Sequence, residues 1–183
     1  TAEETTRELG KANELSSEAA NELFTTIGLG ALKYFILKVD PKKNMLFDPQ
    51  ESIDFNGNTG PFIQYTYARI QSLVARTEGA GWGKEATSLS DSQPMLPLEK
   101  ELAKKLYQFH ETVVQAGEEY SPAIVANYVF ELAKLFNQFY QELPVLKEVD
   151  REKVILRIHL AMFTGNIIRK SMGLLGIGVP ERM

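Results

Sequence analysis

Residues 55–74 read FNGNTGPFIQYTYARIQSLV, and this stretch decides the fold. It opens at residues 56–58 with the turn cluster Asn-Gly-Asn, since Asn and Gly both tolerate positive φ. Thr59 can then cap a helix, and Pro61 fits the first helical turn, where its missing N–H costs no hydrogen bond. The sequence therefore predicts a helix over residues 61–76.

This predicted helix has two unlike faces. At 100° per residue, one stripe is apolar, as a core-facing helix requires, and holds Ile63, Tyr67, Ile70 and Val74. A second face, roughly 140° away by the same geometry, carries Phe62, Tyr65, Arg69, Ser72 and Arg76. One stripe is enough to join a core, so the second face needs a partner. Its rings could stack on unpaired bases with Arg69 on a phosphate, or pack under a neighbouring helix with the Arg69 stem covering them.

The chain after residue 76 reads as three further helices. Beyond a Gly/Ser/Pro-rich loop at 79–97, apolar residues recur with a period of 3.6 across residues 98–116 and predict one helix. Ser121 and Pro122 start the next, over 122–142, whose wide apolar stripe indicates a central position. Asp150 caps the last helix. No segment from residue 59 onward alternates with period 2, so the predicted fold is an all-α bundle.

The N-terminal part reads differently. Ser16 or Ser17 is a plausible helix cap, but Gly28 and Gly30 interrupt the pattern before it resumes at residues 31–38. The two glycines favour a tight backbone approach over a phosphate loop, because no strand precedes them and no Lys-Ser/Thr follows. Residues 40–57 read as a long connection, in which MLFD (45–48) and SIDF (52–55) are expected to be short extended pieces.

Composition narrows the function classes. The 183 residues contain no cysteine, which excludes disulfides, a thiolate nucleophile and cysteine-based metal sites. No apolar run approaches the ~20 residues of a membrane span, so no membrane partner is expected. The net charge of −4 argues against a generally basic nucleic-acid binder. RNA contacts must therefore use local patches, such as residues 147–170, with six basic and three acidic residues.

Nothing in the sequence supports catalysis. His110 and His159 are the only histidines, and neither stands in a metal-ligand spacing with a carboxylate. There is no supported Ser-His-Asp constellation and no nucleotide-binding loop. The sequence predicts no catalytic residue and no metal site, which leaves a binding surface.

Four runs of the sequence resemble class I arginyl-tRNA synthetases. They are TTIGLGALKYFIL (25–37), IDFNGNTGPFIQYTYARIQSL (53–73), SPAIVANYVFELAKLFNQFYQELPVL (121–146) and LRIHLAMFTGNIIRKSMGLLGIGVPERM (156–183). The first is similar to the end of the family's catalytic region, and the others to its helical anticodon-binding domain. The resemblance implies an all-α anticodon-binding helix bundle over 55–183. A short helical remnant of the catalytic domain would precede it, in 1–54.

The resemblance also implies an activity for the full-length protein. Members ligate arginine to tRNA(Arg) with ATP and Mg, and the expected location is cytoplasmic, the expected state a monomer. The HIGH-type and KMSKS-type signatures do not occur in this sequence. This fragment is therefore expected to hold no cofactor and to be inactive alone, with arginine and ATP bound by the missing catalytic domain. Gly60 stands where many members have Ala, a departure expected to be harmless.

The family's anticodon contacts can be carried over by position. They map to Phe62, Tyr65 and Arg69, and less directly to Tyr140 and Met183. Arg157, Arg169 and Lys170 are second-rank candidates for contacts to the RNA backbone. The competing hypothesis is a helical protein–protein interaction module whose Phe62/Tyr65 face docks a partner helix. Salt separates the two, because phosphate contacts weaken steeply with salt and an apolar helix contact changes little.

Overall fold

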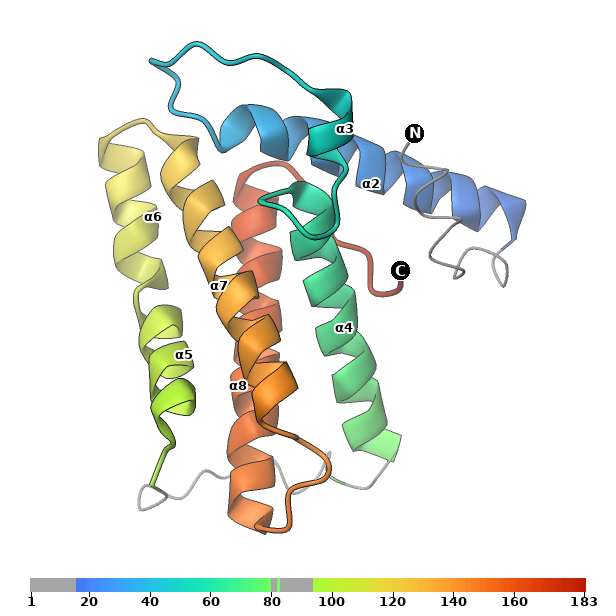
Figure 1. The fold of residues 1–183 in the computed structure, drawn as a ribbon, viewed down its shortest axis with the longest axis vertical. Helices are drawn as coiled ribbons and strands as arrows, with labels where there is room; N and C mark the ends of the chain where they lie inside the picture. Colours follow the sequence, from blue (N-terminus) through green and yellow to red (C-terminus); the bar gives the residue numbers. More distant parts are fainter. Residues whose placement is uncertain (1–15, 80–81, 83–93) are drawn as a thin grey trace.

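The computed structural model describes residues 16–79, 82 and 94–183, and all of the secondary structure that it describes is helical. This confirms the predicted all-α fold. In Figure 1, α4, α7, α8 and the α5–α6 pair run side by side, while α2 lies across one end of the bundle. The helices are α2 (Ser17–Leu37), α3 (Pro49–Ser52), α4 (Gly60–Gly79), α5 (Pro97–Tyr107), α6 (Phe109–Glu118), α7 (Pro122–Glu142) and α8 (Arg151–Leu174).

Three helices begin at the predicted caps. The Ser16 side chain accepts a hydrogen bond from the Ala19 amide, which starts α2. The Thr59 hydroxyl accepts from the Phe62 amide at 3.3 Å and starts α4. The Asp150 carboxylate accepts from the first free amides of α8. Each cap satisfies amides that have no partner within the helix, which is why polar residues mark these starts.

Two boundary predictions are wrong. The helix α2 continues through Gly28 and Gly30, and at Gly30 the missing side chain allows close packing against α4. A Cβ on Gly30 would lie 2.5 Å from Gln64 Nε2 on α4, so the predicted tight approach is confirmed. The single helix predicted over 98–116 divides at Gln108 into α5 and α6. The apolar spacing stays in phase across this bend, so the pattern could not reveal it.

The expected extended pieces are also absent from the described residues. Residues 45–48 have no regular structure, and Ser52 of the second piece ends the short helix α3. Within the same described ranges, no helix is both long and apolar enough to cross a membrane.

The helix α7 is central, as its wide stripe predicts. It packs against α4, α5, α6 and α8. The core also takes in α2, because Tyr34 is fully buried in the same cluster. Its hydroxyl lies 2.9 Å from the Ala126 carbonyl oxygen of α7 and 2.7 Å from Asn58 Oδ1. The division at residue 54 stays a prediction, and α2 packs directly on the bundle.

The backbones of α2 and α4 touch where Gly60 meets Gly30. A Cβ added at Gly60 would lie 2.6 Å from the Gly30 carbonyl oxygen, too close for any side chain. The expectation that Gly60 is a harmless departure stays a prediction, and the structure shows that glycine fits where a larger residue would not. Only glycine allows the two helices to approach this closely.

Replacing Gly60 by alanine is expected to lower the free energy of unfolding by about 1–3 kcal/mol, the usual cost of overpacking. The control is Gly173→Ala in α8, where an added Cβ meets nothing within 4 Å. That change should raise stability by up to about 1 kcal/mol, because alanine favours a helix. Urea denaturation measures the free energy of unfolding of both variants. Equal changes in Gly60→Ala and Gly173→Ala would contradict the close contact between Gly60 and Gly30.

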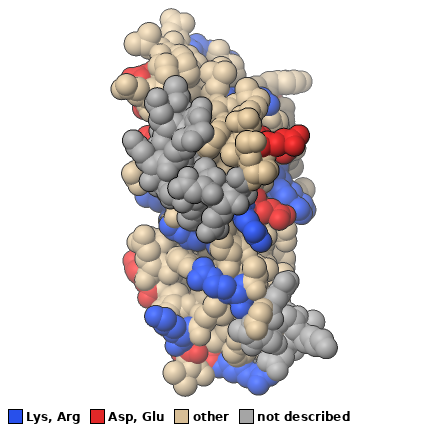
Figure 2. Space-filling model, turned by 90° about the vertical axis from the view of Figure 1, so that its right-hand side faces the viewer, with Lys and Arg blue, Asp and Glu red and all other residues tan. Residues whose placement is uncertain are grey.

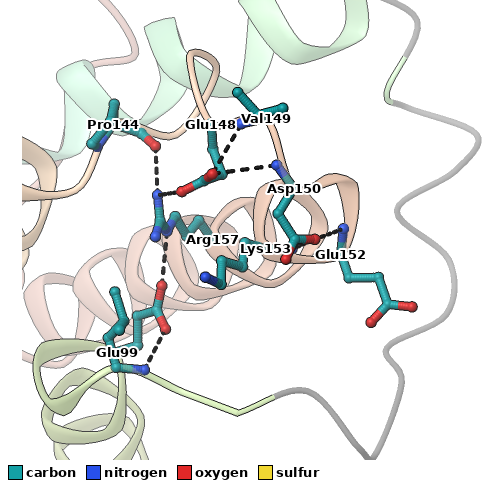
Figure 3. Close-up of polar contacts among 9 residues, drawn as sticks. Glu99, Pro144, Glu148, Val149, Asp150, Glu152, Lys153 and Arg157 are labelled. Atoms are coloured by element: carbon teal, nitrogen blue, oxygen red, sulfur yellow. Dashed lines mark hydrogen bonds and ion pairs between the residues drawn. The ribbon is translucent and has the colours of Figure 1, made fainter.

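A buried ionic cluster joins the start of α5, the α7–α8 connection and α8 (Figure 3). Arg157 is 1% exposed, and its Nε lies 2.8 Å from Glu99 Oε1. Its Nη1 lies 2.9 Å from Glu148 Oε2 and donates to the Pro144 carbonyl oxygen at 2.7 Å. Glu99 also accepts from the Leu96 amide at 2.8 Å. The prediction that Arg157 contacts RNA is wrong, because its guanidinium lies inside the protein.

Acid should weaken this cluster. The amides of Asp150 and Val149, aided by Arg157, hold the pKa of Glu148 below its ordinary value. A carboxylate with a lowered pKa in the folded state stabilises above its unfolded pKa, and that stability is lost as pH falls through the folded pKa. We expect the free energy of unfolding to fall over that acid range, and to fall less in Glu148→Gln. Urea titrations at several pH values test this. If the free energy of unfolding of the parent chain and of Glu148→Gln fell in parallel with pH, the prediction would be contradicted.

Candidate nucleic-acid interface

A pocket of about 230 Å³ opens between α4, α7 and the C-terminal segment. One side of α4 supplies most of its wall, because residues three and four apart share a helix face. The lining side chains are Tyr65, Ala68, Arg69, Ser72, Arg76, Tyr140 and Met183. The structure thus brings together four of the five residues proposed for anticodon contact.

Arg69 lies between two tyrosine rings in this pocket. Its Cζ is 5.0 Å from the ring centroid of Tyr65 and 5.5 Å from that of Tyr140. A guanidinium at this distance is attracted by the ring electrons. Its Nη1 also donates a hydrogen bond to Asn137 Oδ1 on α7. These contacts hold a planar cation, which can pair with a phosphate or a base edge.

A short relay of hydrogen bonds fixes Asn137. Its Nδ2 donates to Thr66 Oγ1 at 2.8 Å, and the Thr66 hydroxyl donates to the Phe62 carbonyl oxygen at 2.9 Å. Sequence reasoning missed both residues. A signal existed for Asn137, since it precedes Tyr140 by three residues and so shares its side of α7.

The two tyrosine rings are each held by another aromatic ring. Phe55 meets Tyr65 edge-on, with centroids 6.5 Å apart and planes at 89°. Phe136 stacks on Tyr140, with centroids 6.1 Å apart and planes at 29°. Both tyrosines are half-buried. Their orientation is set before any ligand arrives, which reduces the entropy lost on binding.

Met183 reaches the pocket from the far end of the sequence. It is 9% exposed and packs in a cluster with Leu23 and Ile27 of α2 and Ala68 of α4. Its side chain also lines the pocket. Gln64, which sequence reasoning missed, helps hold this segment, because its Nε2 donates to the Gly178 carbonyl oxygen at 2.8 Å and to that of Thr26 at 3.2 Å.

Phe62 lies outside the pocket. Its ring packs against Phe130 of α7, with centroids 5.5 Å apart, and joins the edge of the main core. Phe62 is half-buried, as Tyr65 is, so its contact with RNA stays a prediction, although its ring does not line the pocket. The ring takes part in helix packing, which is one of the two alternatives left open for it.

Positive charge gathers on the face beside the pocket. Figure 2 looks onto the side of the molecule formed by α4 and the C-terminal segment, where Lys and Arg dominate the lower half and acidic side chains lie mainly at its margins. Arg169 and Lys170 are exposed on α8. Arg169 lies beside the hydroxyl of Tyr67, where it opposes the effect of burial, which raises the pKa of that tyrosine. The net negative charge of the chain therefore hides a locally basic surface.

Metal binding has no support in the part of the chain that the structure describes. There, no three His, Asp or Glu side chains come close enough to share an ion.

The side chains that line the pocket are suited to holding a flat, electron-rich group that carries negative charge.

Comparisons with known proteins point the same way. Residues 63–183 match the family model of the DALR anticodon binding domain. The chain is 50% identical over 183 residues to an arginine–tRNA ligase of Porphyromonas gingivalis and 49% identical to one of Bacteroides fragilis. All of this chain is covered in both matches, and it spans 30% of the length of these curated relatives.

Solved structures give a matching result. The arginyl-tRNA synthetase of Thermus thermophilus matches with a TM-score of 0.84 and 32% identity, over 100% of this chain and 31% of that one. The enzyme of Plasmodium falciparum matches with a TM-score of 0.76 and 24% identity, over 90% of this chain and 28% of that one. The second match bears on the fold alone.

Proposed function

Because this chain belongs to the DALR anticodon-binding domain family, we propose that its Tyr65–Arg69–Tyr140 pocket binds an unpaired nucleotide of the anticodon loop of tRNA(Arg). The chain acts as the C-terminal part of an arginine–tRNA ligase. Arginine, ATP and Mg bind elsewhere in that protein, which works as a cytoplasmic monomer. Residues 1–54 connect to its catalytic domain, and residues 55–183 read the tRNA.

The single observation that supports this function best is the guanidinium of Arg69 held between two tyrosine rings. Bases turned out of their stack are recognised by aromatic faces and by Arg planes, and a cation beside them attracts the phosphate. Ser72 adds a hydroxyl that can both donate and accept at a base edge. Arg169 and Lys170, exposed on α8, are proposed to attract the RNA backbone.

The competing protein-interaction hypothesis has less support. It requires the Phe62/Tyr65 face to be free for a partner helix, but the Phe62 ring already packs on Phe130. The pocket that remains is lined by charged and hydroxyl-bearing side chains as well as rings. Such a lining suits a nucleotide better than an apolar helix.

The decisive experiment compares the affinity of the 183-residue chain for tRNA(Arg) and for the same tRNA with an exchanged anticodon, at several salt concentrations. We expect tighter binding to the native anticodon and a steep loss of affinity with salt. Equal affinity for the two tRNAs would refute anticodon recognition. A salt-independent affinity would favour the protein-interaction hypothesis.

A variant of the pocket sharpens this test. Tyr65→Ala should weaken binding of tRNA(Arg) by about 5- to 150-fold, since a stacked base contributes roughly 1–3 kcal/mol. The matched control is Tyr107→Ala, a tyrosine of α5 that is 84% exposed. It should bind as the parent chain does. Circular dichroism should show unchanged helix content in both, and equal losses of affinity would refute the role of the pocket.

A further inference from the structure

We propose that Gln64 and Lys33 are positioning residues for the RNA site: they hold the C-terminal segment, residues 175–183, so that Met183 completes the pocket. Neither side chain is among those that line the pocket. This inference rests on the proposed function, because it concerns how the same site is assembled. It also gives α2, which carries Lys33, a part in RNA binding, although the sequence resemblance places α2 in the catalytic region.

The C-terminal segment needs such contacts because its second half has no regular structure. Leu175 and Ile177 are buried in the main core, and Val179 packs partly against it. From residue 178 onward the backbone forms neither helix nor strand, so no series of backbone hydrogen bonds fixes its course. In Figure 1 the segment leaves the end of α8 and finishes beside α4, below α2. The position of Met183 therefore depends on what the segment contacts along this path.

Lys33 holds the beginning of the segment. Its Nζ donates a hydrogen bond of 2.6 Å to the Gly176 carbonyl oxygen, although the two residues are 143 positions apart in sequence. Gly176 has a φ of +67°, in the left-handed region that ends many helices, and there the chain turns out of α8. A charged donor forms a stronger hydrogen bond than a neutral one. Lys33 thus fixes the direction in which the segment leaves α8.

Gln64 holds the middle of the segment. Its Nε2 lies 2.8 Å from the Gly178 carbonyl oxygen and 3.2 Å from that of Thr26, so one amide group joins α4, α2 and the segment. Gln64 is fully buried, and Gly30 leaves room for its amide, since a Cβ at Gly30 would lie 2.5 Å from Nε2. Tyr65 follows directly in the sequence. Gln64 therefore fastens the segment one residue away from a side chain that lines the pocket.

Both contacts act on Met183 through a short stretch of chain. Met183 lies five residues after Gly178 and packs against Leu23 and Ile27 of α2 and Ala68 of α4. When a hydrogen bond to the segment is lost, Met183 stays in this place in a smaller share of the molecules. The apparent affinity for RNA falls with the share that remains competent to bind. A hydrogen bond contributes a factor of about 2 to 10 to such an equilibrium.

The test is a double-mutant cycle, measured as the affinity of the 183-residue chain for tRNA(Arg). Met183→Ala should weaken binding by about 3- to 10-fold, the size of a methionine contact with an aromatic ring. Gln64→Leu and Lys33→Met should each weaken binding by about 3- to 10-fold. In the Met183→Ala background, neither should weaken it by more than about 1.5-fold, because the side chain that they position is already gone.

Two further variants and the salt dependence separate positioning from direct contact with RNA. Lys33→Arg keeps a charged donor and should bind as the parent chain does. Lys104→Met, which removes an exposed cation from α5, is the matched control for lost charge and should also bind as the parent does. The slope of log Kd against log salt should be unchanged in Lys33→Met. A slope smaller in magnitude by about one would show that Lys33 contacts a phosphate, and would refute its positioning role.

The outcomes keep the two proposals apart. The positioning role is refuted, and the proposed function stands, if Tyr65→Ala weakens binding while Met183→Ala does not, or while Gln64→Leu and Lys33→Met do not. It is also refuted if their losses persist in full in the Met183→Ala background. If neither Tyr65→Ala nor Met183→Ala weakens binding, both proposals are refuted. Should circular dichroism show that Gln64→Leu does not fold, the cycle with Lys33→Met decides alone, because Lys33 is exposed.

Discussion

Replacing Arg157 by methionine is expected to lower the free energy of unfolding by about 3–5 kcal/mol, the cost of breaking a buried ion pair from one side. Methionine keeps much of the length of the side chain and loses every donor. The carboxylate of Glu99, 0% exposed, would then stay in the core without its cation, and the Pro144 carbonyl oxygen would lose its donor. Urea denaturation at neutral pH measures the loss.

The control for this prediction lies on the same helix. Lys170→Met removes an exposed charge from α8 and should change stability by less than about 0.5 kcal/mol. A second variant separates lost charge from lost packing. Changing Glu99 to leucine together with Arg157→Met removes both charges, and should recover much of the stability, since apolar groups often replace a buried ion pair at little cost. If Arg157→Met alone were as stable as the parent chain, the ion pair of Arg157 with Glu99 would contribute nothing to stability.

The second large effect is expected on RNA binding. Arg69→Met should weaken the complex with tRNA(Arg) by about 10- to 100-fold, in line with roughly 1–3 kcal/mol for a well-placed arginine contact. The change removes the cation between the rings of Tyr65 and Tyr140 and frees Asn137 from its bond. Arg69→Lys keeps the charge and loses the planar fork, so it should recover only part of the affinity.

Two further readouts tell what Arg69 contacts. If it pairs with a phosphate, the slope of log Kd against log salt should fall in magnitude by about one in Arg69→Met. If it reads a base edge, discrimination between the native and the exchanged anticodon should weaken instead. The control is Lys104→Met on α5, an exposed cation away from the pocket. An Arg69→Met variant with the affinity and selectivity of the parent would refute the proposed role.

Local signals predicted much of this structure. Caps and proline positions placed the starts of α2, α4, α7 and α8, because these signals depend on hydrogen bonds within a few residues. The α4 face with Tyr65 and Arg69 follows from helical geometry alone. Tyr140 and Met183 came only from the resemblance, since no spacing links α7 or the last residue to α4.

The rest depends on contacts between distant segments. Phe62 and Tyr65 are close on the helical wheel, and only Phe130, on another helix, decides that the first ring packs at the edge of the core while the second lines the pocket. The burial of Arg157 likewise needs Glu99, 58 residues away in sequence. Gly28 and Gly30 favour a break because glycine disfavours helices, but α2 runs through both, and at Gly30 the contact with α4 depends on glycine.

The contact between Gly30 and Gly60 has a mechanical consequence. Between most helices, side chains form a compliant layer that can absorb small shifts. Here the carbonyl of one helix lies directly against the backbone of the other, and Tyr34 pins α2 to α7 nearby. Tyr65 lies on α4 little more than one helical turn after Gly60. A displacement of α2 would therefore be transmitted directly to the first turn of α4, because no flexible side chain lies between the two backbones.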